Sequence, residues 1–345
     1  MDSASQLLIE KVEAEHALSR AEAEALMEEL LCGRISTPEI VRVLLALNRR
    51  PVGVDELSGF ARVMRRHAAP VFAPDEPRPT GLVDTCGTGG DETGTFNIST
   101  ASAIVAAAAG ARVAKHGNRS VSSRSGSADV LEALGVRIDL PMTVAGRSVR
   151  EIGIGFLFAP AAHAAARHAA PARQQIGKRT IFNLLGPLTN PAGAETQVLG
   201  VFSPETIEAV AATLAELGTH RAFVVHGAGG LDEISLAGET QIAEVREGTV
   251  RRFIIAPEDF GLSRAPLEAI RGGTPQDNAT LIHSLLAGEP GPRLDIAIAN
   301  AAAALVVAGL AEDFRAAAEL ARRAIHSGQA HKKLEQLKTF SRRER

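Results

Sequence analysis

The sequence contains no tryptophan and no tyrosine, and aromatic residues make up only 3% of its 345 residues. A hydrophobic core must therefore be built from Ala, Leu, Val and Ile together with twelve Phe. The only two cysteines, Cys32 and Cys86, do not form a C-x-x-C pair, so their spacing indicates no thiol metal site. So few cysteines fit a reducing cytoplasm, which is the expected location.

An excess of charge of one sign is also missing, because 37 basic residues are balanced by 40 acidic ones. The chain has no strong global field to hold a nucleic-acid backbone, so no nucleic-acid partner is expected. The acidic start, 1–15, lacks the pattern of a signal peptide. The longest apolar run, 296–311, contains Asn300 and is shorter than the roughly 20 residues of a membrane-spanning helix. It is predicted to be a buried helix, no membrane partner is expected, and the basic end, 332–345, is predicted to be a solvated terminal helix.

Helical signals dominate the first part of the chain. Ser19 and Glu22 have the spacing of a capping box, and Thr37 and Pro38 are predicted to be an N-cap and a first helical residue. Four prolines between residues 70 and 79 then indicate a linker. We therefore expect two domains, a helical domain over 1–73 and an α/β domain over 74–345.

The pattern changes after this linker. Short runs rich in Val and Ile alternate with Ala-rich helical stretches, which predicts an α/β fold with a mostly parallel central sheet flanked by helices. In such sheets ligands bind beyond the carboxyl ends of the strands. The expected strands are 81–83, 112–114, 155–158, 198–202 and 222–225, and the expected helices are 99–109, 128–134, 204–217 and 296–310.

A glycine-rich string, Gly-Thr-Gly-Gly-Asp over 87–91, follows the first expected strand. Residues 95–100, Thr-Phe-Asn-Ile-Ser-Thr, then open an Ala-rich helix. Glycine lets backbone N–H groups approach a ligand closely, and a helix N-terminus offers free N–H donors and a positive dipole end. A tight turn with a Ser or Thr cap is the alternative, but the whole string favours a phosphate site.

A second polar loop, Lys-His-Gly-Asn-Arg-Ser-Val-Ser-Ser over 115–123, follows the next expected strand. Two fixed cations, an amide and several hydroxyls are the donors that bind phosphate groups. Ser127 begins the following helix, where it is predicted to be the N-cap and is also a candidate ligand. This loop is therefore expected to complete the phosphate site.

Two adjacent carboxylates, Asp232 and Glu233, follow the expected strand 222–225 and a flexible glycine loop. Such a pair suits magnesium, which prefers a few carboxylates together with water and substrate phosphates. A charged turn is the alternative to a metal site, and the two expected phosphate loops favour the metal site.

Arg173 lies in Ala-rich sequence. Its guanidinium could hold a carboxylate through two hydrogen bonds, or it could simply be a surface group.

Together with the segments 155–160 and 180–191, these motifs closely resemble the anthranilate phosphoribosyltransferase family of tryptophan biosynthesis, over nearly the whole chain. The resemblance implies a nucleoside phosphorylase/phosphoribosyltransferase-like two-domain architecture. The helical domain would also take in about 162–188 and would form a homodimer. The implied reaction moves the phosphoribosyl group of phosphoribosyl pyrophosphate to the amino nitrogen of anthranilate, with magnesium, two ions per chain, as cofactor.

The resemblance also assigns roles to residues of this sequence. Its magnesium positions are Ser99, Asp232 and Glu233, and its anthranilate positions are Gly87, Asn118 and Arg173, with Pro160 and His163 lining the route. Its donor-binding positions are Gly87, Gly90, Asp91, Thr95, Asn97, Ile98, Ser99, Thr100, Lys115, His116, Gly117, Asn118, Arg119, Ser120, Val121, Ser122, Ser123 and Ser127.

One position departs from the family: Ala166 stands where some relatives carry Tyr, which predicts a wider or less polar outer acceptor channel. An aniline-type nitrogen is neutral near neutral pH, so no strong general base is required. His116 is a candidate for late proton removal, and hydrogen bonding within its loop is the alternative role.

Two other functions would fit the same fold, a pyrimidine nucleoside phosphorylase and a non-catalytic nucleic-acid-binding relative. The adjacent carboxylates and the balanced charge disfavour both.

Overall fold

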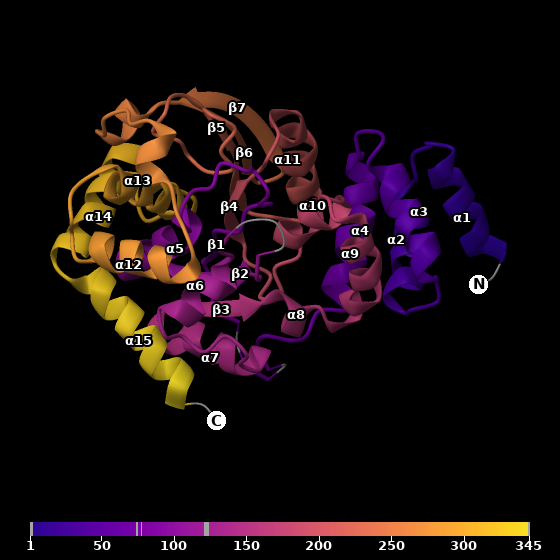
Figure 1. Ribbon diagram of the computed structural model, residues 1–345, viewed down its shortest axis with the longest axis horizontal. Coiled ribbons are helices and arrows are strands. Elements are labelled where there is room, and N and C mark those ends of the chain that lie inside the picture. The colour runs from indigo at the N-terminus through magenta and orange to yellow at the C-terminus, as the bar shows by residue number, and fades with distance from the viewer. Residues whose placement is uncertain (1–2, 74, 77, 121–123, 344–345) are drawn as a thin grey trace.

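The computed structural model describes residues 3–73, 75–76, 78–120 and 124–343. They form one seven-stranded sheet with helices packed around it, and a further group of helices lies to one side (Figure 1). The strand order is β3-β2-β1-β4-β5-β6-β7. The strands are β1 Leu82–Asp84, β2 Arg112–Gly117, β3 Ile154–Phe158, β4 Thr196–Gly200, β5 Arg221–Gly227, β6 Thr240–Arg246 and β7 Thr249–Ile255.

The first five strands pair in parallel, whereas β6 and β7 pair antiparallel. The predicted mostly parallel α/β sheet is confirmed, and each expected strand overlaps an observed one. The β6–β7 hairpin was not expected. Its turn, Glu247-Gly248, has φ values of 49° and 80°, the left-handed values of a two-residue hairpin turn. The sequence of β7, Thr-Val-Arg-Arg-Phe-Ile-Ile, lacks the alternation that signals a strand.

Four N-terminal helices form the group at one side of the sheet (Figure 1). The capping box of Ser19 and Glu22 is present, because each side chain bonds to the backbone N–H of the other residue. The expected cap at Thr37 is wrong by one residue. Ser36 is the N-cap, since the Glu39 carboxylate accepts hydrogen bonds from its backbone N–H and its hydroxyl. The helices are α1 Ser3–Glu13, α2 Arg20–Leu31, α3 Thr37–Leu47 and α4 Val54–Arg66.

A later segment of the chain packs against these four helices. Buried residues between Ala169 and Leu188 belong to the same hydrophobic cluster as α1 to α4, and α9 packs against α3 in the group of helices at one side of Figure 1. Residues far apart in sequence therefore share one apolar interior, although the division into domains stays a prediction. The segment contains α8 Ala159–Ala162, the 3-10 helix Ala164–Ala169, α9 Ala170–Ile176 and α10 Ile181–Leu188.

The remaining helices cover the sheet. The expected helix over 204–217 is in fact a 3-10 turn, Pro204–Thr206, followed by α11, whereas the helix expected over 296–310 is confirmed as α13. No described helix is long and apolar enough to span a membrane. The covering helices are α5 Ile98–Ala108, α6 Ser127–Ala133, α7 Met142–Ile152, α11 Ile207–Glu216, α12 Pro275–Leu286, α13 Pro292–Val307, α14 Phe314–His326 and α15 Gln329–Arg343, with short 3-10 turns at Pro257–Phe260 and Leu267–Ile270.

Asn300 is a buried polar residue in the otherwise apolar helix α13. Its side-chain oxygen accepts from the Ile234 N–H at 2.9 Å, and its amide nitrogen donates to the carbonyls of Ile234 and Ile296, each at 3.0 Å. Ile234 directly follows the adjacent carboxylates Asp232 and Glu233. A buried backbone group needs a partner, so Asn300 fixes the chain just beyond these carboxylates.

The variant Asn300→Leu should be less stable than the wild type. It keeps a side chain of similar size but leaves both backbone groups of Ile234 unpaired, which typically costs about 1–3 kcal/mol for each group. The free energy of unfolding, measured by urea denaturation, checks this expectation. An unchanged free energy of unfolding would show that Ile234 finds other partners.

Candidate functional site

Three loops meet beyond the carboxyl ends of the parallel strands. They follow β1, β2 and β5, whose ends point to the same edge of the sheet. The N–H of Gly89, in the loop after β1, donates to Oδ2 of Asp232, in the loop after β5, at 2.8 Å. The N–H of Thr88 donates to the Gly200 carbonyl at the end of β4, at 2.9 Å. The glycine-rich string and the adjacent carboxylates, predicted separately, therefore lie in direct contact.

Glycines allow the carboxylate loop to approach the strands this closely. A Cβ on Gly200 would lie 1.5 Å from the Asp232 carbonyl oxygen, and one on Gly227 would lie 2.4 Å from the Glu233 carbonyl oxygen. A Cβ on Gly87 would lie 3.1 Å from Oδ2 of Asp232. At Gly200 and Gly227 the absence of a side chain is therefore a packing requirement of the two carboxylates.

Three carboxyl groups converge here. Asp91 and Glu233 lie close enough to Asp232 for their negative charges to act on it, and Glu233 lies beside Ser99. Burial, followed by the negative charges of Asp91 and Glu233, raises the pKa of Asp232 well above its usual value. Burial also raises the pKa of Glu233, although the positive charge of Lys115 opposes this. A bound cation would strongly stabilise the ionised form of carboxylates that lie close together in a buried environment. A set of oxygen donors of this kind fits a hard divalent metal.

Lys115 is the buried cation of the site, with only 4% of its surface exposed. Its ammonium donates to the carbonyl and the hydroxyl of Thr85, at 3.0 and 3.2 Å. Nearby, the buried Asp84 carboxylate accepts from Asn190 Nδ2 at 2.7 Å and from the His116 N–H at 3.1 Å. Burial raises the pKa of Asp84 to about 6. The buried part of the described site thus contains more acidic than basic side chains.

The start of α5 supplies the next group of predicted residues. Asn97 is its N-cap, and the Asn97 amide binds the Ser125 carbonyl at 3.0 Å. The hydroxyl of Thr100 is buried and has no hydrogen-bond partner among the described residues. Thr95 forms a bridge with Arg271. The side chain of Ile98 is 2% exposed and its N–H donates to the Phe96 carbonyl, so Ile98 offers no free polar group here.

The loop after β2 is held by its own contacts. Arg119 pairs with Asp129 and with Glu132 of α6, and the Ser120 N–H also binds Asp129. The predicted N-cap at Ser127 is wrong, since Gly126 precedes the helix and Ser127 is its first residue. The Ser127 hydroxyl instead bonds to both backbone groups of Asn118. A Cβ on Gly117 would lie 2.3 Å from this hydroxyl, and Val121, Ser122 and Ser123 lie outside the described residues.

Two buried histidines meet beside this loop. The rings of His116 and His163 are edge to face, with centroids 5.2 Å apart. Nδ1 of His116 lies 3.1 Å from the Gly186 carbonyl oxygen, and the Nε2 atoms of both rings have no partner among the described residues. Burial, with the neighbouring His163, lowers the pKa of His116 to about 3, and burial lowers the pKa of His163. Both imidazoles are therefore neutral.

The other predicted acceptor residues lie on the segment after β3. Arg173 of α9 stacks over the Phe182 ring, with its guanidinium carbon 5.2 Å from the centroid. Its guanidinium forms no ion pair or hydrogen bond with a described residue, and burial lowers the pKa of Arg173. Pro160 is exposed on α8, and Ala166 is half-buried. Contacts of the described residues join His116 to His163 but do not join Arg173 to Asn118 or to either histidine.

One contact at the site was not predicted from the sequence. Arg179, between α9 and α10, forms an ion pair with Glu92 of the glycine-rich loop at 3.0 Å. Its guanidinium also stacks over Phe202, 4.6 Å from the ring centroid, and its stem lies against Gly90. Glu92 has a φ of 61°, a left-handed value that is uncommon outside glycine. Nothing local in the sequence links residues so far apart in the chain.

Comparison with known proteins defines the class first. A model of the glycosyl transferase family, a/b domain, matches residues 79–331, and a model of the helical bundle domain of that family matches residues 6–68. Both parts of the chain thus belong to one class of glycosyl-transferring enzymes.

Individual relatives narrow this class. The anthranilate phosphoribosyltransferase of Symbiobacterium thermophilum is 49% identical over 97% of both chains, and that of Pelotomaculum thermopropionicum is 51% identical over 96% of this chain and 95% of its own. The Thermus thermophilus enzyme structure matches with a TM-score of 0.91 and 45% identity over 97% of this chain and 99% of its own. The Saccharomyces cerevisiae enzyme, solved in complex with PRPP and Mg, matches with a TM-score of 0.89 and 25% identity over 99% of both chains. The chain belongs to the anthranilate phosphoribosyltransferase family.

The buried neutral His116 should make the protein sensitive to acid. Its pKa is lowered from 6.5 to about 3, so between these values the unfolded chain takes up a proton that the folded chain does not. Stability is therefore lost as the pH falls from about 6.5 toward 3, by about 2 kcal/mol at pH 5 from this residue alone. Urea denaturation at pH 7.5 and at pH 5 should show a smaller acid loss in His116→Gln. An equal loss in both proteins would assign the acid sensitivity to other groups.

Proposed function

We propose that the chain transfers the phosphoribosyl group of phosphoribosyl pyrophosphate to the amino nitrogen of anthranilate, in tryptophan biosynthesis. The products are N-(5-phosphoribosyl)anthranilate and pyrophosphate. The observation that carries the proposal is the direct contact between the glycine-rich loop and the carboxyl cluster, through Gly89 and Asp232. It unites a phosphate-binding loop with a metal-binding group, which a pyrophosphate leaving group requires. Relatives of about half-identical sequence carry the name of this activity along the whole chain.

The carboxyl cluster is the proposed magnesium site. Asp232, Glu233 and Ser99 would hold the metal, with Asp91 close to them, and two ions per chain are part of the proposal. The raised pKa values of Asp232 and Glu233 support it, because an added cation relieves the repulsion that raises them. When bound, magnesium neutralises negative charge on the pyrophosphate and so favours its departure.

Protein groups would hold the donor in place. The backbone N–H groups of the glycine-rich loop and of the α5 N-terminus suit phosphate oxygens. Thr100, in the first turn of α5, adds a hydroxyl that has no partner among the described residues. Lys115 places a fixed positive charge beside them, where it can stabilise the leaving pyrophosphate. Residues 117–123 and Ser127 complete the proposed donor contacts. Arg119 enters this set only by leaving its ion pairs with Asp129 and Glu132.

Arg173 and Asn118 are proposed to hold anthranilate, with Gly87, Pro160 and His163 around it. A guanidinium without an ion-pair partner among the described residues suits the carboxylate of an incoming acceptor. The acceptor amine is neutral and attacks without prior deprotonation. A histidine whose pKa is about 3 is a weak base, so the hydrogen bond of His116 to Gly186 favours a positioning role over proton removal.

Domain organisation, oligomeric state and location complete the proposal. We assign 1–73 with about 162–188 to a helical domain and the rest to an α/β domain. The support is that both helical segments contribute to one hydrophobic cluster, which continues onto one face of the sheet. A homodimer through the helical domain is supported by two exposed leucines, Leu7 of α1 and Leu45 of α3, which are 64% and 44% exposed. A cytoplasmic location is expected for a biosynthetic enzyme of this class.

The double variant Asp232→Asn/Glu233→Gln tests the metal site. Magnesium-dependent turnover should be lost, since amides bind a hard cation more weakly than carboxylates do. Stability should not fall, because the substitutions remove buried negative charge. The matched control is Glu239→Gln, which alters an exposed carboxylate of the same loop region and should retain activity. Full activity of the double variant in magnesium titrations would exclude these carboxylates as ligands.

Arg173→Ala tests the acceptor site. Losing a hydrogen bond to a charged group typically costs about 1.5–3 kcal/mol, which is roughly ten- to a hundredfold in binding. The KM for anthranilate should rise by this factor while the KM for the donor changes little, and Arg173→Lys should rescue only in part. Arg167→Ala, which removes an exposed arginine of the same segment, is the control. If plain aniline, which has no carboxylate, is weakened as much as anthranilate, Arg173 does not bind the acceptor carboxylate.

A further inference from the structure

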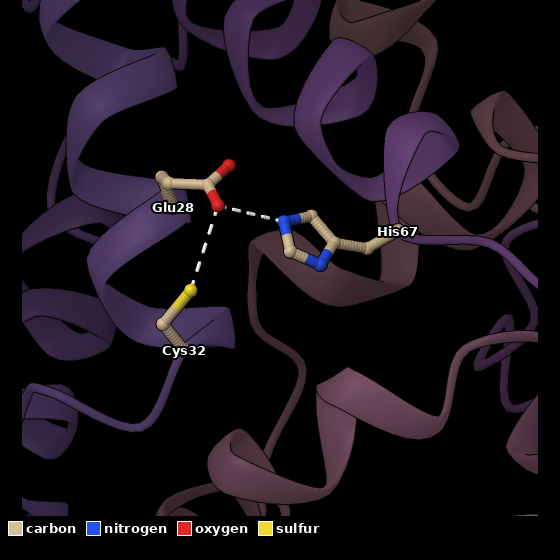
Figure 2. Close-up of side chains that lie close together, drawn as sticks. All are labelled: Glu28, Cys32 and His67. Atoms are coloured by element: carbon tan, nitrogen blue, oxygen red, sulfur yellow. Dashed lines mark hydrogen bonds and ion pairs between the residues drawn. The ribbon is translucent and has the colours of Figure 1, made fainter.

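Three side chains with metal-binding atoms meet in the N-terminal helical group, and none of them belongs to the site described above. Glu28 lies on α2, Cys32 is the C-cap residue of α2, and His67 is the C-cap residue of α4 (Figure 2). The Glu28 carboxylate, the Cys32 sulfur and one ring nitrogen of His67 all lie within 4.8 Å of one another. The cluster joins two helices at their ends.

The distances within this cluster fit a small metal ion. Oε1 of Glu28 lies 2.8 Å from Nε2 of His67 and 3.5 Å from Sγ of Cys32. Zinc is held at about 2.3 Å from sulfur and about 2.0–2.2 Å from nitrogen or oxygen, so ligand atoms around a tetrahedral ion lie roughly 3.3–3.7 Å apart. The three side chains therefore need only small movements to surround an ion. Figure 2 shows the Cys32 sulfur and a ring nitrogen of His67 directed at the same oxygen of Glu28.

Helix geometry brings the three ligands together in advance. Glu28 and Cys32 are four residues apart, which places them on the same face of one helical turn. His67 is brought to this face because α4 packs closely on α2. Gly59 of α4 makes that approach possible, since a Cβ there would lie 2.6 Å from the Arg20 carbonyl oxygen. The same contact that builds the helical group thus builds the cluster.

The charges around the cluster leave one carboxylate oxygen for a metal. Arg66 approaches the other oxygen of Glu28, Oε2, at 3.7 Å and makes its closer ion pair with Glu24 at 2.9 Å. The hydrogen bond from His67 is the main cause that lowers the pKa of Glu28, so this carboxyl group is ionised near neutral pH. The thiol of Cys32 and the ring of His67 both direct a hydrogen bond at Oε1, and a cation between them replaces those two bonds.

We propose that Glu28, Cys32 and His67 bind one zinc-class transition-metal ion, with water as the fourth ligand, and that the ion links α2 to α4. On binding, the Cys32 thiol releases its proton to solvent. The proton that His67 directs at Glu28 from Nε2 is exchanged with solvent, so that the ring carries one proton on Nδ1 while Nε2 binds the metal. Thiolate and imidazole select such metals over magnesium, so this site is chemically distinct from the carboxyl cluster. Its role is structural, because ligand binding to the folded state stabilises that state.

Cobalt(II) titration of the full chain in magnesium-containing buffer tests the proposal. A tetrahedral site with a thiolate ligand should give a sulfur-to-cobalt charge-transfer band that saturates at one ion per chain and disappears when zinc is added. Zinc in hundredfold excess over its Kd should raise the unfolding midpoint by about 2–4 °C. Both effects should be lost in Cys32→Ser and in His67→Gln.

The matched control is Cys86→Ser, which changes the other cysteine and should keep the cobalt band and the zinc-dependent rise in midpoint. Circular dichroism of each variant without metal verifies that it is folded. A wild-type protein without the charge-transfer band overturns the proposal, and so does a band that persists in Cys32→Ser. A band without any change in the unfolding midpoint overturns the structural role.

Discussion

The close contact between the carboxylate loop and the ends of the parallel strands is the constraint on which the site depends. The Asp232 backbone lies so close to Gly200 that no side chain fits between them, and Gly227 has the same relation to Glu233. Asp232 also accepts the hydrogen bond of Gly89, so one residue ties the ends of β1, β4 and β5 together. The parallel sheet brings the loops to a common edge, and the glycines determine how closely the carboxyl groups approach the glycine-rich loop.

This arrangement brings ionisable side chains together in a buried environment, which favours their neutral forms. Asp84, Asp232 and Glu233 all have raised pKa values, each chiefly because of burial, and Lys115 is the buried cation beside them. A fold selected for stability alone would avoid such a group, because unpaired buried charge is destabilising. A divalent cation among these carboxylates, as in the proposed magnesium site, would make this unfavourable interaction favourable, so the arrangement suits the ligand-bound protein better than the ligand-free chain.

The sequence predicted the parts of this structure that depend on local pattern. Strand runs, the Ser19 capping box and the order of polar loops were all visible, because parallel strands place successive loops on one edge. The β6–β7 hairpin was missed because an exposed edge strand does not alternate, and the caps at Thr37 and Ser127 were misplaced by one residue. Arg179 with Glu92, and Glu28 with Cys32 and His67, depend on tertiary contacts. The four-residue spacing of Glu28 and Cys32 indicates a shared helix face. No spacing rule brings His67 to that face or Arg179 to Glu92, and the absence of a C-x-x-C pair pointed away from a thiol site.

The hydrophobic interior limits how the parts of the chain can move. Leu199 of β4 and Val224 of β5 belong to the same apolar cluster as α1 to α4, whereas their neighbours Val198 and Phe223 face the cluster on the other side of the sheet. The helical group therefore continues the core of one sheet face. An ion pair between exposed side chains, such as Arg179–Glu92, typically contributes only about 0–1 kcal/mol. Such a pair is too weak to hold the helical group against the sheet. Apolar packing anchors the helical segment, and the polar contacts at the glycine-rich loop are the ones weak enough to exchange when substrates bind.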